Sequence, residues 1–302
     1  MKLHPAILPL CQDLANAGGH AYIVGGWVRD LHLGLPSKDV DLEVFGLEQD
    51  RLLEILRWHG KAHAVGKSFG VLKLRVAGVE LDVALPFDGQ APDPYLPLER
   101  AVLRRDLRCN ALYYDPLSAE TLDPTGGLKD LRQGLLRAVS EQSLPQDPLR
   151  ALRALRFACT KGMALDPELS AQIRVTSLAE VAPERVLGEL RKVLGSVDPA
   201  KGLSLLHSTT LGTQIFPAVD GQAAAERVAL VQPHLKLLAK AAHRESLLWG
   251  TWLLDLPHPA ESLAAWGLHK VNGIPLKRWL PALRRALKPL SDSELRSLAD
   301  TL

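Results

Sequence analysis

The stretch "AYIVGGWVRDLHLGLPSKDVDLEVFG", residues Ala21–Gly46, combines a β-like run, a turn with two glycines, a helical segment and an alternating run. The alternating part, "KDVDLEVF", predicts a strand. Side chains at positions i and i+2 of a strand point to the same face, so Asp39 and Asp41 are expected side by side. Two carboxylates that close repel each other. Their pairing predicts a positive group between them.

A third carboxylate follows on a later predicted strand. Asp82 lies in "GVELDVAL", the second arm of a hairpin that turns at Ala77-Gly78. Three carboxylates converging from two strands suit Mg²⁺, which leaves its other positions to water and phosphate. The alternative is an exposed strand edge with solvated aspartates, and an isolated Asp-x-Asp would favour that alternative.

The glycine turn changes this balance. Gly25 and Gly26 follow a predicted strand and precede a predicted helix. Backbone N–H groups at such a turn approach an anion closely, and a helix N-terminus favours negative charge. Arg29 adds a charge-assisted contact to phosphate. A phosphate site a few residues from a metal site indicates phosphoryl or nucleotidyl transfer to a hydroxyl group.

Size and composition set wide limits. The chain has 302 residues, 47% of them hydrophobic, which suffices for one large domain or two or three small ones. The net charge of +2 says little about partners. Three separated cysteines suit a reducing cytosol and give no zinc-ligand spacing. The N-terminal run predicts a helix rather than a signal peptide, and no apolar run reaches the roughly 18 residues of a membrane span. We therefore expect a cytoplasmic protein without a membrane partner.

Five ordered motifs carry a family resemblance. The segments "GGWVRD" and "KDVDLEV" resemble the opening motif of the class II tRNA nucleotidyltransferases and bacterial poly(A) polymerases, within the polymerase-β-like superfamily. Later segments resemble further motifs of that family in the same order, with departures at Arg108, Cys109 and Gln146. These segments are "RRDLRCNAL" (Arg104–Leu112), "DPTGGLKDLRQGLLRAV" (Asp123–Val139), "QDPLRALRALRF" (Gln146–Phe157) and "PERVLGEL" (Pro183–Leu190). The stretch "TLGTQIFP" resembles the segment that follows these motifs in the family. Together they are far more specific than any one of them.

The resemblance implies roles for residues of the N-terminal part. Asp39 and Asp41 match the catalytic, metal-binding pair, and Asp82 matches a third acidic position. Mg²⁺ is the implied cofactor. The positions that match nucleotide-binding residues are Gly25, Gly26, Arg29 and Asp30 around the triphosphate, and Arg105, Asp106 and Asn110 at the ribose and phosphate.

A predicted helix matches the family's base-reading segment. Asp147 and Arg150 match the pair that reads the incoming base, and the chemistry is sound, because a carboxylate accepts from an exocyclic amine and arginine donates to ring nitrogen and carbonyl oxygen. Arg153 and Arg156 continue this face and are expected to meet phosphate. The alternative is an N-cap aspartate with solvated arginines. In the later motif Glu184, Arg185 and Glu189 are expected to brace this helix.

One departure concerns the product. The hairpin strand ends in "LDVALP" without the family's usual arginine, and only a short, proline-rich loop links Pro86 to Arg104. In the family this loop helps to switch from CTP to ATP, and members with a shortened loop stop after two cytidines. The resemblance therefore favours a CC-adding tRNA 3′-end nucleotidyltransferase that uses CTP, with a separate A-adding enzyme acting afterwards. The alternatives are a complete CCA-adding enzyme that uses CTP and ATP, a poly(A) polymerase, or a catalytically silent RNA-binding module.

The C-terminal part is rich in basic residues and tryptophan. Such a helical surface suits the phosphate backbone of RNA, and recognition of the acceptor and T arms of tRNA by shape needs no base readout. The alternative is an amphipathic helix with a solvated basic face, and the tryptophans favour core positions. The candidate RNA-binding residues are Lys270, Lys277, Arg278, Arg284 and Arg285.

The order of elements and the resemblance together predict an α+β chain. Strands and helices alternate up to about Arg137, and the pattern is helical beyond Gln146. We expect a polymerase-β-like nucleotidyltransferase head with a mixed sheet over residues 1–138, a helical neck over 139–217, and a helical body and tail over 218–302.

Overall fold

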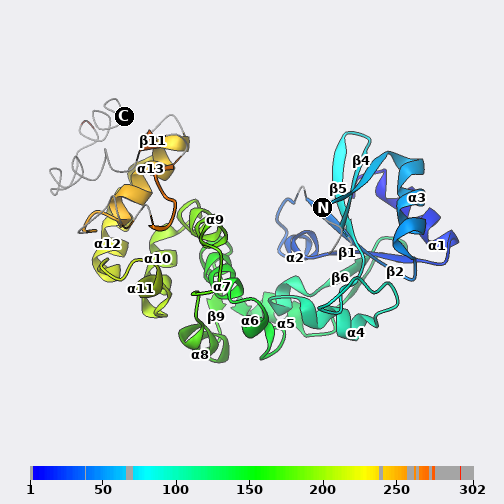
Figure 1. Cartoon of the computed structure of the whole chain (residues 1–302), viewed down its shortest axis with the longest axis horizontal. Coiled ribbons are helices and arrows are strands. Elements are labelled where there is room, and N and C mark those ends of the chain that lie inside the picture. The colour runs from blue at the N-terminus through cyan, green and yellow to red at the C-terminus, as the bar shows by residue number, and fades with distance from the viewer. Residues whose placement is uncertain are drawn as a thin grey trace. The chain divides into compact units, whose positions relative to one another are not determined.

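The computed structural model describes residues 3–37, 39–65, 71–237, 241–256, 262, 265–271, 274–275 and 293. The chain divides into two compact units, Met1–Ser143 and Leu144–Leu302 (Figure 1). The first unit contains a mixed sheet and the second is mainly helical, which confirms the α+β fold class. The finer division into head, neck and body stays a prediction. Each unit is described by itself below.

The first unit is built on a seven-stranded sheet with the order β3-β4-β5-β2-β1-β6-β7. Neighbouring strands run antiparallel except β2 and β5, which are parallel. The second strand of the β4–β5 hairpin, β5, therefore lies next to β2. The strands are β1 His20–Val24, β2 Val40–Phe45, β3 Lys61–Val65, β4 Val71–Val76, β5 Val79–Ala84, β6 Tyr113–Asp115 and β7 Glu120–Leu122.

Two amphipathic helices pack beside the sheet. Helix α1 (Ile7–Asn16) contacts β1 and α3, and α3 (Gln49–His59) contacts β3 and β4. Alternation along β2 buries Leu42 and Val44 completely on one face. Asp41 and Glu43 therefore share the opposite face of β2. The predicted N-terminal helix is confirmed as α1.

Part of the acidic face is covered by a small apolar cluster. Its buried members are Val24, Val102, Ala111, Tyr113 and Val139. Short helices α4 (Leu98–Ala101) and η1 (Val102–Arg104) bring the middle of the chain onto this face. The cover leaves Asp41 accessible to solvent, while Glu43 is buried. One strand thus presents a solvent-accessible carboxylate and a buried one.

The glycine-containing motif after β7 supports the segment that precedes β6. The Asp123 carboxylate accepts from the backbone N–H of Gly127 at 2.7 Å and of Leu128 at 3.0 Å, which caps α5 (Gly127–Gln133). A Cβ on Gly127 would lie 2.2 Å from the carbonyl oxygen of Arg108, the first residue of η2 (Arg108–Asn110). Only glycine permits this approach. The motif therefore fixes the backbone of the "RRDLRCNAL" segment.

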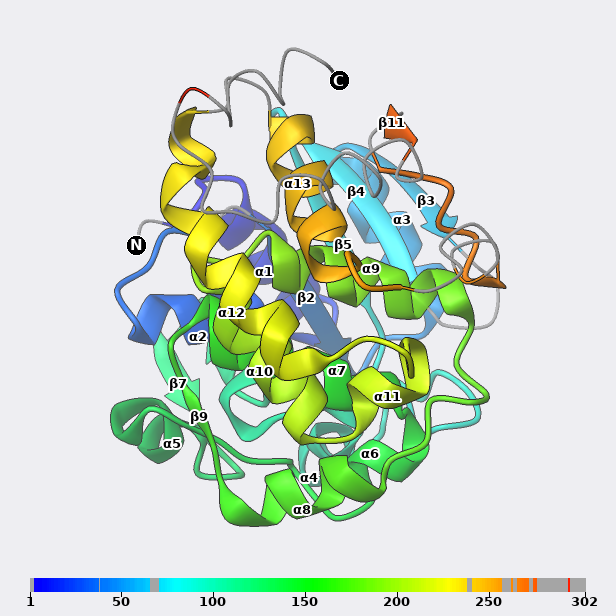
Figure 2. The same ribbon diagram turned by 90° about the vertical axis from the view of Figure 1, so that its left-hand side faces the viewer.

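The second unit is a set of packed helices. Helix α7 contacts α9 and α10, and α10 lies beside α12 (Figures 1 and 2). The helices are α7 Leu149–Thr160, α8 Pro167–Val175, α9 Pro183–Leu194, α10 Pro199–Ser208, α11 Leu211–Ile215, α12 Gly221–Val231, η3 Gln232–Leu237 and α13 Ala241–Trp252. Shorter elements of this unit are β9 Ala164–Leu165 and the antiparallel pair β10 Lys270–Val271 and β11 Ile274–Pro275. The short strand β8 Leu135–Leu136 belongs to the first unit, and α6 Ser143–Gln146 begins at the last residue of that unit.

Local sequence explains where several of these helices begin. Asp166, Asp198 and Asp220 each accept a backbone N–H at the start of α8, α10 and α12. Helix α7 differs, because it begins at Leu149 after Pro148 and has no side-chain cap. Trp249 and Trp252 of α13 are completely buried, which confirms core positions for these two tryptophans. None of the helices within the described ranges is long and apolar enough to cross a bilayer.

Candidate active site

The register of two parallel strands brings the predicted carboxylates together. Asp41 on β2 pairs directly with Asp82 on β5, and paired residues share a face of the sheet. Asp39 lies just before β2 and is exposed. Packing around the carboxyl group, then the charges of Asp82 and Asp39, raise the pKa of Asp41, while Arg105 and Lys73 act in the opposite direction. Asp82 therefore lies beside Asp41, while the catalytic and metal-binding roles of Asp39, Asp41 and Asp82 stay predictions.

This acidic cluster fits a divalent cation that substrate helps to hold. Within the described ranges no group of three or more His, Cys, Asp or Glu side chains is arranged to hold a metal ion unaided. Mg²⁺ in phosphoryl-transfer sites takes only one or two carboxylates and completes its shell with phosphate and water. The carboxylates of Asp39 and Asp41 are accessible to solvent and are oxygen donors of the kind that Mg²⁺ takes, and metal binding by this pair stays a prediction.

The glycine turn lies against the same cluster. Gly25 has φ +70°, a conformation that favours glycine. A Cβ built on Gly25 would lie 3.8 Å from Oδ2 of Asp41. Gly26 begins α2 (Gly26–His32), so the start of this helix and the carboxylates are neighbours. The predicted phosphate cradle and the predicted metal site therefore occupy one place.

Polar side chains of two separate motifs form a buried network behind the turn. Arg29 donates from Nε to Oδ1 of Asp30 at 2.9 Å and from Nη1 to Oδ1 of Asn110 at 2.7 Å. Asn110 donates from Nδ2 to Oδ1 of Asp106 at 3.0 Å. All four residues are buried. The network joins α2 to the "RRDLRCNAL" segment, which indicates that these residues position the glycine turn; their predicted contacts with triphosphate and ribose stay a prediction.

Arg105 has a different partner. Its Nη2 donates to Oε2 of Glu43 at 2.6 Å, and its guanidinium carbon lies 5.7 Å from the centre of the Tyr113 ring. The Glu43 side chain is 9% exposed and that of Arg105 is 27% exposed. Arg105 therefore stays close to solvent beside the carboxylate face. Sequence reasoning missed Glu43, although its position two residues after Asp41 places it on the same face.

Lys73 is a second residue that sequence reasoning missed. Its Nζ donates to Oδ1 of Asp82 at 2.8 Å and to Oε1 of Glu80 at 2.9 Å. Lys73 lies opposite Asp82 in the β4–β5 hairpin. The hairpin turn at Ala77-Gly78 fixes this register, so the sequence contained the signal. The carboxylate of Asp82 is therefore paired with the ammonium of Lys73. A carboxylate that served as a third metal ligand would instead be expected to face the metal ion.

In the second unit, α9 braces α7. The Arg185 Nη2 lies 3.0 Å from Oδ2 of Asp147. The Arg156 Nε lies 2.7 Å from Oε2 of Glu189, whose side chain is only 5% exposed and which also accepts from Lys192 at 2.9 Å. The expected bracing role of Arg185 and Glu189 is confirmed, and that of Glu184, which is exposed, stays a prediction.

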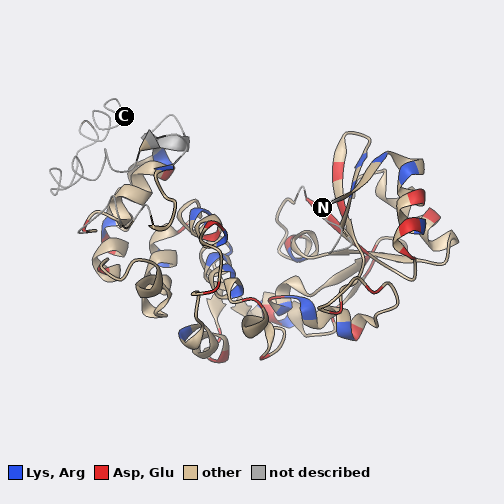
Figure 3. Cartoon of the chain, in the orientation of Figure 1, with Lys and Arg blue, Asp and Glu red and all other residues tan. Residues whose placement is uncertain are grey.

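The other predicted residues of α7 retain solvent access. Arg150 and Arg153 are both half-buried, and the guanidinium of Arg153 lies 6.0 Å from the Phe157 ring. The blue colour of lysine and arginine positions recurs along the ribbons of α7 and α9 (Figure 3). The base-reading role of Asp147 and Arg150 and the phosphate contacts of Arg153 and Arg156 stay predictions.

The buried carboxylate of Glu189 gives the first testable expectation. Glu189→Ala leaves Arg156 without this partner in a half-buried site, and we expect the free energy of unfolding of the helical unit to fall by about 3 kcal/mol. The matched control is Glu184→Ala in the same helix, where an exposed first-turn glutamate costs less than about 1 kcal/mol. Denaturant unfolding followed by circular dichroism measures both. Equal losses in the two variants would contradict the bracing role.

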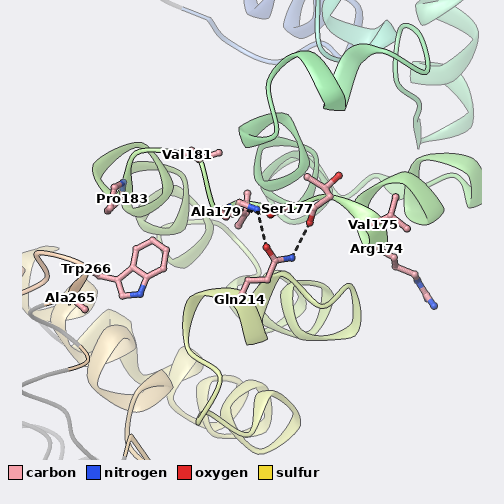
Figure 4. A pocket seen from close by; sticks show the side chains of 11 residues that line it. Arg174, Val175, Ser177, Ala179, Val181, Pro183, Gln214, Ala265 and Trp266 are labelled. Carbon is pink, nitrogen blue, oxygen red and sulfur yellow. Dashed lines mark hydrogen bonds between the residues drawn. The ribbon is translucent and has the colours of Figure 1, made fainter.

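A pocket in the second unit has a different character. It has a volume of about 760 Å³ and lies beside the segment that links α8 to α9 (Figure 4). Gln214 uses both ends of its amide on that segment, accepting from Leu178 N–H at 2.8 Å and donating to the Thr176 carbonyl at 2.9 Å. None of the nucleotide-binding residues predicted from the sequence lines this pocket.

The predicted RNA-binding residues are only partly covered by the structure. Lys270 lies on β10 and is exposed. Lys277, Arg278, Arg284 and Arg285 lie outside the described residues. The RNA-binding assignment of all five stays a prediction.

Known proteins share both units of this chain. Residues 21–137 match the poly(A) polymerase head domain, and residues 162–222 match a domain described as a probable RNA and SrmB-binding site of polymerase A. The multifunctional CCA protein of Xanthomonas campestris pv. campestris (strain B100) is 37% identical over 215 residues, which cover 66% of this chain and 51% of that protein. This chain belongs to the family of the tRNA nucleotidyltransferases and bacterial poly(A) polymerases.

Two further family members bear on specificity. The CC-adding tRNA nucleotidyltransferase of Halalkalibacterium halodurans is 31% identical over 226 residues, which cover 74% of this chain and 56% of that protein. A crystal structure of the Bacillus stearothermophilus CCA-adding enzyme in complex with CTP matches with a TM-score of 0.78 and 28% identity, over 98% of this chain and 75% of that one. The chain spans about half the length of the curated relatives it matches.

Proposed function

We propose that this chain is a template-independent tRNA 3′-end nucleotidyltransferase that adds two cytidines from CTP and releases pyrophosphate. The observation that carries the proposal is the Asp41–Asp82 register with Gly25 against Asp41, in a head domain of this family. Family members similar to this chain are named CCA-adding and CC-adding enzymes, and one was crystallised with CTP. Carboxylates and a phosphate-binding turn serve CTP and ATP equally well. The choice of CTP therefore rests on the base-reading residues and on the loop between β5 and α4.

The reaction follows from the residues around the glycine turn. The 3′-hydroxyl oxygen of the RNA attacks the α-phosphorus of CTP, the new O–P bond forms as the bond to pyrophosphate breaks, and the hydroxyl proton is released to solvent. Asp39 and Asp41 would hold Mg²⁺, which when bound lowers the pKa of the attacking hydroxyl and stabilises charge on the leaving pyrophosphate. The backbone N–H groups at Gly25 and Gly26 bind phosphate oxygens. The buried Arg29 network keeps the turn in position.

Base selection is assigned to Asp147, which precedes α7, and to Arg150 in the first turn of α7. Asp147 accepts from the exocyclic amine of cytosine, and Arg150 donates to the ring nitrogen and carbonyl oxygen. An ionised carboxylate has about four acceptor positions. The contact of Asp147 with Arg185 therefore orients the carboxylate and leaves positions for the amine.

The loop between β5 and α4 supports the choice of two cytidines. Asp88 accepts from the N–H groups of Gln90 and Ala91 at 2.6 and 2.8 Å, which closes a tight turn. The Gly46 N–H donates to the Pro94 carbonyl at 2.7 Å and fixes the loop to the end of β2. A loop that is short and hydrogen-bonded at both places is poorly suited to switch the site from CTP to ATP.

Sizing of reaction products tests the proposal. We incubate the protein with tRNA that lacks its 3′ CCA, Mg²⁺ and each nucleotide singly or together, and we expect two cytidines with CTP and no extension of that product by ATP. Extension to C-C-A would identify a complete CCA-adding enzyme, and a ladder of adenosines would identify a poly(A) polymerase. Binding of tRNA without extension would identify a silent RNA-binding module and contradict the proposal.

A further inference from the structure

A row of charged residues crosses three strands of the head sheet. Lys73 on β4 pairs with Asp82 on β5, and Asp82 pairs with Asp41 on β2. Directly paired side chains lie on the same face, and neighbouring strands are about 4.8 Å apart. Lys73 therefore stands two strands from the carboxylate pair, on the face that the nucleotide would approach.

Two carboxylates hold the ammonium group of Lys73. Its Nζ is 2.8 Å from Asp82 Oδ1 and 2.9 Å from Glu80 Oε1, and the side chain is 34% exposed. Hydrogen bonds to Asp82 and then Glu80 raise the pKa of Lys73, so the group stays charged at neutral pH. An ammonium has three N–H donors. The third finds no acceptor in the described part of the chain and is available to a ligand.

This arrangement affects what Asp82 is able to bind. A divalent cation on Asp82 would lie next to the ammonium that the same carboxylate holds, and two cations at that separation repel. In the part of the chain that the structure describes, no hydrogen bond joins a lysine to Asp39 or Asp41, although the charge of Lys73 acts on Asp41, and both carboxylates are accessible to solvent. The three acidic residues are therefore not equivalent.

We propose that Asp82 is a positioning residue and not a metal ligand: together with Glu80 it holds Lys73, whose ammonium binds the phosphates of the nucleoside triphosphate beside the Asp39–Asp41 site. The inference rests on the proposed function. In this proposal Lys73 on β4 supplies a positive charge for the phosphates on one side of β2, and the glycine turn after β1 lies on the other side. It also explains why a lysine is placed across the hairpin from the third acidic position.

A measurement of metal binding by the full chain distinguishes a metal-ligand role of Asp82 from a role in positioning Lys73. Titration of Mn²⁺ alone, followed by electron paramagnetic resonance, measures the dissociation constant without catalysis. We expect Asp82→Asn to change this constant by no more than about twofold, while Asp41→Asn weakens binding at least about tenfold. A loss of Mn²⁺ affinity in Asp82→Asn equal to that in Asp41→Asn would make Asp82 a ligand and overturn the proposal.

Equilibrium binding of CTP in the presence of Mn²⁺ tests Lys73. We expect Lys73→Met to weaken CTP binding about tenfold, Lys73→Arg to restore part of it, and the double variant with Asp82→Asn to bind no worse than Lys73→Met, because both changes disable one contact. Lys61→Met, an exposed lysine on β3, is the matched control and should bind CTP as the unaltered protein does. Unchanged CTP affinity in Lys73→Met would overturn the proposal.

Failure of the proposed function gives a different pattern. If the unaltered protein binds CTP but does not extend tRNA, the proposed function is wrong, and the Lys73 variants still decide the phosphate contact. If the unaltered protein binds no CTP, both are wrong.

Discussion

Asp41→Asn is expected to slow nucleotide addition to tRNA by about a thousandfold. Metal-assisted stabilisation of the transition state is worth several kcal/mol, and each 1.36 kcal/mol is tenfold in rate. The change removes a charged ligand and keeps the shape of the side chain. It also relieves repulsion with Asp82 and Asp39, so the melting temperature should stay the same or rise. Initial rates of CMP incorporation and thermal unfolding measure the two effects.

The combination of lost activity and retained stability is the informative result. Asp50→Asn, which changes an exposed carboxylate in the first turn of α3, is the matched control and should alter the rate less than about twofold. Near-normal addition in Asp41→Asn would contradict the metal assignment. A large drop in melting temperature would show that Asp41 is structural.

Arg29→Met is expected to destabilise the head unit by about 3 to 5 kcal/mol. The change removes a guanidinium that is hydrogen-bonded to Asp30 and Asn110, and it leaves a buried carboxylate without its charged partner. Hydrogen exchange of the β1 and β2 amides follows the head separately from the helical unit, since local opening reports regional stability. We expect faster exchange in β1 and β2 and little change in α10 and α12.

Two further variants define the origin of this loss. Arg57→Met removes an exposed arginine from α3 and should cost less than about 0.5 kcal/mol. Adding Asp30→Asn to Arg29→Met removes the stranded charge and should recover part of the stability. A loss below about 1 kcal/mol in Arg29→Met, or no recovery in the double variant, would contradict a coupled buried network.

The sequence predicted the features that depend on local spacing. The alternation around Asp39 and Asp41, the glycine turn before α2 and the hairpin at Ala77-Gly78 each follow from neighbouring residues. The helical character of the second half follows from apolar periodicity. These features were sufficient to predict an acidic, phosphate-binding face on an α+β head.

Partners that depend on tertiary packing were not predictable in the same way. Strands β2 and β5 are neighbours in the sheet, but β3 and β4 separate them in the sequence. The Asp41–Asp82 register therefore depends on how the whole sheet assembles. The ion pair of Arg105 with Glu43 joins residues 62 positions apart. Arg29 was predicted as a phosphate ligand because of its charge, but its burial and its bond to Asn110 follow from the packing of α2 against η2.

The most direct test of the account is to locate the cation. Crystals grown with Mn²⁺ and a non-hydrolysable CTP analogue allow anomalous diffraction to place the metal. We predict a peak about 2.1 Å from carboxylate oxygens of Asp39 and Asp41, beside the triphosphate at the Gly25-Gly26 turn. A metal and triphosphate bound elsewhere, with Asp39 and Asp41 facing only water, would contradict it.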